Sequence, residues 1–195
     1  MCGIVGLFLK DSALEPQLGT LLSAMLVTMT DRGPDSAGLA IYGAPVPGQS
    51  KITVQSARPM ADFDGLEQGL AEVSGGTARV AVKSTHAVIT VATDRFAATR
   101  AALKGHSPNL RVMGAGESVE IYKDVGLPKD VVERFGIASM TGTHGIGHTR
   151  MATESAVTTL GAHPFSTGAD QCLVHNGSLS NHNNLRRAPV SYTHL

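Results

Sequence analysis

The sequence is poor in cysteine and in charge, and it has no long hydrophobic run. Two cysteines among 195 residues cannot build a disulfide framework, so we expect a reducing compartment. The 16 basic and 16 acidic residues cancel, which argues against nucleic acid or an anionic membrane as a partner. No apolar run reaches the length of a membrane span, and the first residues lack the basic region of a signal peptide. We therefore expect a cytoplasmic protein.

The residues that are present favour compact mixed structure. Charged residues make up only 16% of the chain and glycines number 22, which is typical of a tightly turned protein with part of its surface covered by another subunit. A chain of 195 residues can bury a core as one large domain or as two small ones.

The spacing of apolar residues predicts both strands and helices. Near the N-terminus it indicates a buried strand over residues 4–9, a helix over 14–29 and a second buried strand over 37–42. Further along, it predicts strands over residues 51–57, 86–92, 111–113, 119–122 and 171–174, and helices over 62–72, 94–103, 128–135 and 178–187. We interpret residues from about 44 to 140 as an α+β insert in a larger fold.

Cys2 is the most informative residue because it directly follows the initiator methionine. If that methionine is removed, one residue carries both a thiol and a free α-amine. The α-amine has a pKa of roughly 7.7–8.0 and can act as the general base for a thiol whose pKa is about 8.5. A cysteine at this position can equally be an incidental small residue, so other motifs must decide.

Three further motifs suit a site around such a thiolate. Arg150 follows a strand-like run and can clamp a carboxylate, although a surface salt bridge is the simpler interpretation. Asn176 and Gly177 follow an apolar strand and can form an oxyanion hole, or a plain turn. The segment from Arg32 to Asp35 joins a helix to a strand, where we favour an internal ion pair that fixes the turn.

Other kinds of site are not supported by the sequence. His144 and His148 have the spacing of a helical zinc site, but neighbouring glycines indicate an extended segment, so we expect no metal. Two Gly-x-Gly pairs lack the third glycine of a dinucleotide loop, so we expect no such cofactor. No serine lies in a nucleophile-elbow motif.

Taken in order, five motifs resemble those of class II glutamine amidotransferases. This N-terminal-nucleophile hydrolase type occurs in glutamate synthase, amidophosphoribosyltransferase, glucosamine-6-phosphate synthase and asparagine synthetase. The inserted middle makes the chain most similar to stand-alone, glutamate-synthase-like glutaminase subunits. The motifs are Cys2-Gly-Ile-Val-Gly-Leu7, Arg32-Gly-Pro-Asp-Ser-Ala-Gly38, Gly147-His-Thr-Arg-Met-Ala-Thr153, Ala162-His-Pro164 and Val174-His-Asn-Gly177.

The resemblance implies a fold and a reaction. The fold is a four-layer αββα sandwich of two antiparallel sheets. Cys2 attacks the side-chain amide of glutamine, which gives a thioester and ammonia, and its own α-amine shuttles the proton; no metal or cofactor is implied. Arg150 binds the substrate carboxylate, with Thr153 as a support. Asn176 and Gly177 stabilise the oxyanion. Arg32, Gly33 and Asp35 position the nucleophile strand.

The chain also departs from the family pattern. The family has an aspartate downstream of the His-Asn-Gly turn that binds the substrate amino group, but no aspartate follows Asp170. Residues 188–195 do not match the family, and Pro189 breaks the preceding helix. We therefore expect an amidotransferase domain over residues 1–187, incomplete at its C-terminus, followed by a non-native tail.

The expected partners are L-glutamine and an ammonia-accepting synthase, either as a separate subunit or as a missing C-terminal domain. Two alternatives stay open. The chain can be a catalytically weak or inactive interaction subunit, or a fragment, of such a synthase. It can also be an N-terminal-nucleophile amidase for a substrate other than glutamine.

Overall fold

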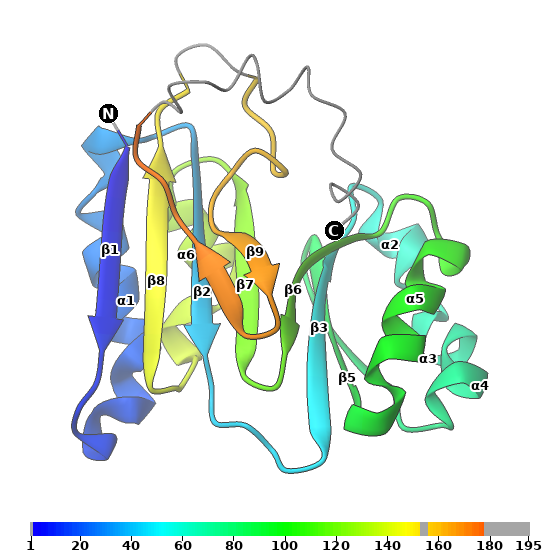
Figure 1. The fold of residues 1–195 in the computed structure, drawn as a ribbon. Helices are drawn as coiled ribbons and strands as arrows, with labels where there is room; N and C mark the ends of the chain where they lie inside the picture. The colour runs from blue at the N-terminus through cyan, green and yellow to red at the C-terminus, as the bar shows by residue number, and fades with distance from the viewer. Residues whose placement is uncertain (1, 153–155, 178–195) are drawn as a thin grey trace.

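The computed structural model describes residues 2–152 and 156–177, and it shows an α+β fold built on antiparallel sheets (Figure 1). The first sheet has the strand order β1-β8-β2-β7. Its strands are β1 (Gly3–Phe8), β8 (His144–Arg150), β2 (Ser36–Tyr42) and β7 (Val119–Val125). β1 therefore pairs with a strand far along the chain, which brings the N-terminal residues beside the end of β8.

One face of this sheet is covered by α1 (Leu18–Val27) and α6 (Pro128–Phe135), which lie behind it in Figure 1. Leu18, Leu22 and Leu26 recur every fourth residue, so they share one face of α1, and all three are fully buried. They join Val5 and Leu39 from the sheet in the first hydrophobic core. Burial of this apolar stripe, rather than helix propensity alone, fixes α1 on the sheet.

A second sheet with the order β4-β5-β3-β6 has its own core. Ile52 and Ile89 from its strands lie in this core with Leu66 and Leu103 from its helices. Leu70, between α3 and α4, belongs to the same core. The strands are β3 (Gln49–Gln55), β4 (Arg79–Lys83), β5 (His86–Ala92) and β6 (Arg111–Gly116), and the helices are α2 (Pro59–Asp62), α3 (Leu66–Gly69), α4 (Ala71–Ser74) and α5 (Phe96–His106). Short 3-10 turns are found at Ser12–Gln17, Thr30–Arg32, Thr93–Arg95 and Ile137–Ser139.

A small hairpin, β9 (Phe165–Gly168) and β10 (Gln171–Leu173), lies across the face of the first sheet that α1 and α6 leave open (Figure 1). Cys172 of the hairpin packs on a third cluster that contains Ala40, Met113 and Ile121. This hairpin matters for function because the chain runs from β10 straight into the Asn176-Gly177 turn.

The structure confirms the α+β class and most of the predicted elements. The strands expected over residues 4–9, 37–42 and 86–92 and the helix over 128–135 are present. The helix over 14–29 begins only at Leu18, after a 3-10 turn that contains Pro16. The segment 178–187 and the tail 188–195 lie outside the described residues.

Three predictions about elements were wrong. The helix expected over 62–72 is split into short helices, because Gly65 adopts a left-handed conformation (φ +65°) before α3. β1 is not wholly buried: its residues alternate, and Ile4 and Phe8 are 40% and 66% exposed. The strand expected over 111–113 is longer, because β6 continues through Gly114 to Gly116. Sequence reasoning also missed β4 and β9.

The predicted insert contributes to both sheets. The second sheet and its helices lie within residues 49–116, whereas β7 and α6, which also fall between 44 and 140, belong to the first sheet and its helical layer. The boundary of the insert therefore stays a prediction. Among the described helices, none has the length and apolar character needed to cross a membrane.

Candidate active site

Cys2 lies at the edge of the first sheet, one residue before β1. Because Gly3 pairs with Thr149, the ladder between β1 and β8 sets Cys2 beside Arg150, the last residue of β8. The Cys2 thiol is half-buried and free, and its Sγ lies 4.0 Å from the carbonyl oxygen of Met151. The sulfur is therefore accessible at the point where β8 ends.

Asn176 reaches this residue from the other end of the described chain. Its side-chain Nδ2 donates a hydrogen bond to the Cys2 carbonyl oxygen at 2.9 Å. A side-chain amide nitrogen carries two hydrogens, so one fixes the amide on Cys2 and the second can donate to another oxygen. Gly177 follows with φ +148°, a conformation open to glycine and strained for other residues. The structure thus brings Cys2 and the Asn176-Gly177 turn together.

Arg150 extends from the end of β8 toward the loop before β9. Its Nη1 donates to the carbonyl oxygen of Ala156 at 3.3 Å. A Cβ at Gly161 would lie 3.1 Å from the same nitrogen, so the loop passes close to the guanidinium. Thr153, predicted to support Arg150, lies outside the described residues.

The Arg32-to-Asp35 turn packs on the end of β8. The Asp35 backbone N–H donates to the Arg150 carbonyl at 3.1 Å, and an oxygen of the Asp35 carboxylate accepts from the Ala152 N–H at 2.7 Å. Gly33 is needed for close approach, since a Cβ there would lie 2.5 Å from the backbone nitrogen of Arg150. The turn therefore fixes the backbone that carries Arg150.

The prediction of an internal ion pair in this turn was wrong. Arg32 is exposed, and within residues 2–152 and 156–177 its side chain forms no ion pair. Asp35 instead accepts a backbone N–H from the neighbouring segment. The turn is stabilised by backbone hydrogen bonds and a close glycine contact rather than by opposite charges.

His144 and His148 both lie on β8. Positions four apart on an extended strand are separated by about 13 Å, so the two imidazoles cannot share one metal ion. His144 instead stacks on Tyr42, with ring centroids 4.1 Å apart. The part of the chain that the structure describes contains no group of three or more potential ligands suited to a metal.

No family model matches the chain, but two relatives are similar to it over nearly its whole length. Over 187 residues, 96% of its length, the chain is 74% identical to the glutamine amidotransferase-like protein GlxB of Rhizobium meliloti. Over 95% of its length it is 31% identical to a protein provisionally named glutamine amidotransferase from Methanothermobacter thermautotrophicus. The resemblance to glutamine amidotransferases is confirmed.

A further match covers a shorter part of the chain. Eighty residues, 40% of the chain, are 32% identical to a glutamine–fructose-6-phosphate aminotransferase of Methanococcus maripaludis and cover 13% of that protein. The chain spans only 62% and 64% of the lengths of the first two relatives. The activity and partners of the whole relatives therefore do not follow from the similarity alone.

Sequence reasoning missed the contacts that hold the β9–β10 hairpin in place. At its turn, Asp170 accepts hydrogen bonds from a neighbouring turn. In its middle, the Tyr42 hydroxyl lies 3.3 Å from the Cys172 sulfur. Beyond its end, His148 Nε2 lies 3.1 Å from the carbonyl oxygen of His175. An aspartate two residues after Gly168 and just before an apolar strand is a turn signal, but the partners of Asp170 are distant in sequence.

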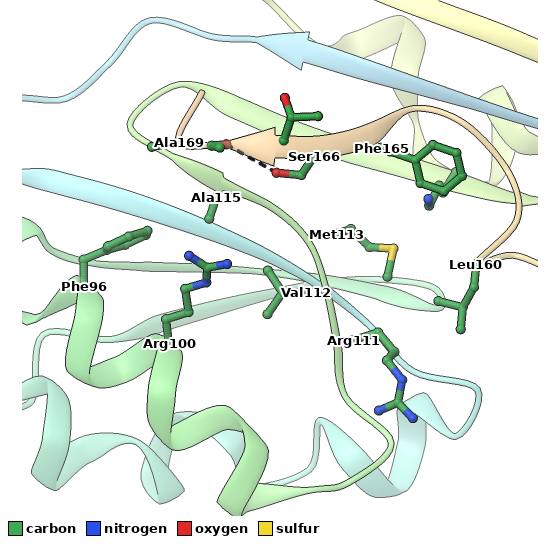
Figure 2. A pocket seen from close by; sticks show the side chains of 13 residues that line it. Phe96, Arg100, Arg111, Val112, Met113, Ala115, Leu160, Phe165, Ser166 and Ala169 are labelled. Atoms are coloured by element: carbon green, nitrogen blue, oxygen red, sulfur yellow. Dashed lines mark hydrogen bonds between the residues drawn. The ribbon is translucent and has the colours of Figure 1, made fainter. Parts of the chain in front are cut away.

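A separate cavity of about 300 Å³ lies between α5, β6 and β9 (Figure 2). Arg100 from α5 and Arg111 from β6 line it, together with the rings of Phe96 and Phe165. Lys123 also lines it, and burial lowers the pKa of its ammonium to about 8. None of the predicted site residues is among the lining residues. The predicted site residues that the structure describes therefore lie around Cys2 and the end of β8 and not in this cavity.

Proposed function

We propose that this chain is the glutaminase half of a glutamine amidotransferase, acting through a thioester on Cys2 and supplying ammonia to a glutamate-synthase-like partner in the cytoplasm. The observation that carries the proposal is the hydrogen bond from Asn176 to the Cys2 carbonyl oxygen, at 2.9 Å. It brings an amide donor onto the residue that holds the nucleophile. The relatives named as glutamine amidotransferases support glutamine as the substrate.

The chemistry begins once Met1 has been removed. The α-amine of Cys2 takes the thiol proton, and the sulfur attacks the side-chain carbonyl carbon of glutamine. The resulting oxyanion accepts the second N–H of the Asn176 amide and the backbone N–H of Gly177. When the C–N bond breaks, the α-amine returns the proton to the leaving nitrogen, which departs as ammonia. Water then hydrolyses the thioester to glutamate and restores the thiol.

Arg150 binds the α-carboxylate of glutamine in this proposal, with Thr153 as a support. The position of Arg150 opposite Cys2 in the β1–β8 register favours this role. Gly33 and Asp35 hold the backbone at the end of β8 through the contacts described above. We extend the proposal to a four-layer αββα sandwich as the fold of this domain.

The experiment is ammonia release from glutamine by the full-length protein, combined with labelling by a glutamine-mimicking diazoketone. We expect ammonia release and an adduct on Cys2, while Cys172, the chain's other thiol, serves as the internal control. The variant Cys2→Ala should lose both signals. A folded protein with Met1 removed that shows neither signal would contradict the proposal and favour an inactive interaction subunit. Turnover of another amide alone would favour a different substrate.

A further inference from the structure

The turn that carries Asn176 depends on a hairpin that has little stability of its own. β10 contributes only Gln171–Leu173 and pairs only with β9 within the described residues. A two-stranded ribbon is marginally stable at best in water. The position of Asn176 and Gly177 beside Cys2 is therefore set by whatever fastens the hairpin to the rest of the fold.

Asp170 fastens the far end of the hairpin to the turn between β6 and β7. Its carboxylate accepts hydrogen bonds from the backbone N–H groups of Glu117, Ser118 and Val119 at 2.8, 2.8 and 2.9 Å. Although burial opposes it, these N–H donors hold the pKa of Asp170 below its usual range. A Cβ at Gly116 would collide with this carboxylate, so the two turns are closely fitted.

His148 fastens the near end, directly beside the oxyanion turn. Its Nε2 lies 3.1 Å from the carbonyl oxygen of His175, the residue before Asn176. A carbonyl oxygen only accepts, so Nε2 must carry the proton and donate it. The side chain is fully buried in the middle of β8, whose backbone is held by strands on both sides.

The state of the His148 ring agrees with this assignment. Burial lowers its pKa, so the imidazole is neutral near pH 7, and the bond to His175 partly opposes the shift. Its Nδ1 has no hydrogen-bond partner within the described residues. The ring instead packs beside His163, with centroids 4.3 Å apart. The hydrogen bond to His175 is thus the polar contact that the described structure gives this side chain.

We propose that His148 and Asp170 are positioning residues that fasten the β9–β10 hairpin at its two ends and so hold the Asn176-Gly177 turn at the oxyanion position beside Cys2. The inference rests on the proposed glutaminase function. Neither residue touches the reacting atoms; both act through the same short segment of backbone. Since a displacement near 1 Å can lower a rate about 10²-fold, loss of either fastening should lower kcat roughly 10- to 100-fold. KM should change little, because the oxyanion forms only during the reaction.

The variants are chosen to separate positioning from folding. His148→Phe keeps an aromatic ring and removes the donor, whereas His148→Gln places an amide N–H near the former Nε2 and should restore most of kcat. Asp170→Gly removes the carboxylate but tolerates the positive φ of +53° at this position. Asp62→Asn is the matched control, because Asp62 is a buried carboxylate that bonds Ser56 and Ser107 far from the hairpin. It should lower stability without lowering kcat.

Steady-state kinetics on the full-length protein is paired with amide hydrogen exchange over residues 171–177. We expect faster exchange there in His148→Phe and Asp170→Gly, with wild-type exchange in Asp62→Asn. Folded His148→Phe and Asp170→Gly with wild-type kcat and wild-type exchange would overturn the inference, as would a raised KM at unchanged kcat. If His148→Phe does not fold, Asp170→Gly decides the outcome. A wild-type protein without glutaminase activity would refute the proposed function, while the exchange data would still test the fastening.

Discussion

At Asn176 a single side chain links the two ends of the described chain. One N–H of its amide donates to the Cys2 carbonyl, which sets the direction of the other. Asn176→Ala removes both donors, so we expect kcat to fall by on the order of 10²–10³. Steady-state ammonia release measures the change, with Asn176→Asp as an isosteric control that also lacks N–H donors. A wild-type rate in Asn176→Ala would remove this residue from the oxyanion site.

At Arg150 the proposed contact is made to the substrate in both ground and transition states. A lysine keeps the charge but cannot form the two parallel bonds of a guanidinium. We therefore expect Arg150→Lys to raise the KM for glutamine roughly tenfold or more, with kcat largely kept. Initial rates over a range of glutamine concentrations separate the two parameters. A lowered kcat at unchanged KM would argue that Arg150 does not bind the substrate carboxylate.

The sequence predicts some residues of the site and misses others. Cys2, Arg150 and Asn176 stand out because their residue types suit a reaction, and the topology places them together; their roles stay predictions. His148 lies in one of the five motifs but was given no role except that of a rejected metal ligand, and Asp170 was noted only as the last aspartate of the chain. Both act through backbone atoms of distant segments, and neither residue type nor spacing reveals such a partner.

At the scale of elements, the end of β8 and the turn that precedes β2 form one tightly packed unit. A Cβ at Gly33 would lie 2.5 Å from the Arg150 backbone nitrogen, whereas a Cβ at Gly6 on β1 would meet nothing within 4 Å. We expect Gly33→Ala to lower the free energy of unfolding by about 1–3 kcal/mol through overpacking. The matched change Gly6→Ala should be neutral or stabilising.

Urea unfolding of the two glycine variants gives this comparison directly. Because φ at Gly33 is −168°, an alanine there adopts the same extended backbone, and the expected loss comes from the collision alone. Equal stability of Gly33→Ala and Gly6→Ala would show that the turn can move away from β8 at no cost.

The elements that sequence predicted well are those with one strongly apolar face. α6 was predicted to the residue because proline begins it and buried residues recur at helical spacing. β4 was not predicted, because its residues are largely exposed at the edge of the second sheet. The short helices α3 and α4 resembled one continuous helix because the left-handed glycines that bound them are not visible in the apolar pattern.

At the scale of the whole molecule, buried neutral histidines make stability depend on pH. Burial lowers the pKa of His86 to about 4, and the ring packs edge-on against Phe135 with centroids 4.8 Å apart. The unfolded chain binds a proton at this residue near pH 6.5, the folded chain only near pH 4. The contribution of neutral His86 to the free energy of unfolding is therefore complete above pH 6.5. It is lost as the pH falls toward 4, by about 1.4 kcal/mol per pH unit.

His86→Phe keeps the aromatic packing and removes the titration. We expect its unfolding free energy to fall less than that of the wild-type protein between pH 6.5 and 4.5. Urea titrations at several pH values measure the free energy of unfolding of both proteins. Carboxylates that titrate in both proteins contribute equally, so their effect cancels in the difference between the two profiles. Parallel profiles for the two proteins would mean that His86 does not carry this dependence.

The whole account depends on Cys2 being the first residue of the mature protein, since only then does it carry both the sulfur and the free amine. The most direct test is mass spectrometry of the N-terminal peptide from the full-length, catalytically active protein after reaction with the diazoketone. We predict a peptide that begins at Cys2, carries the adduct on Cys2 and leaves Cys172 unmodified. Turnover of glutamine by molecules that still retain Met1 would contradict the account.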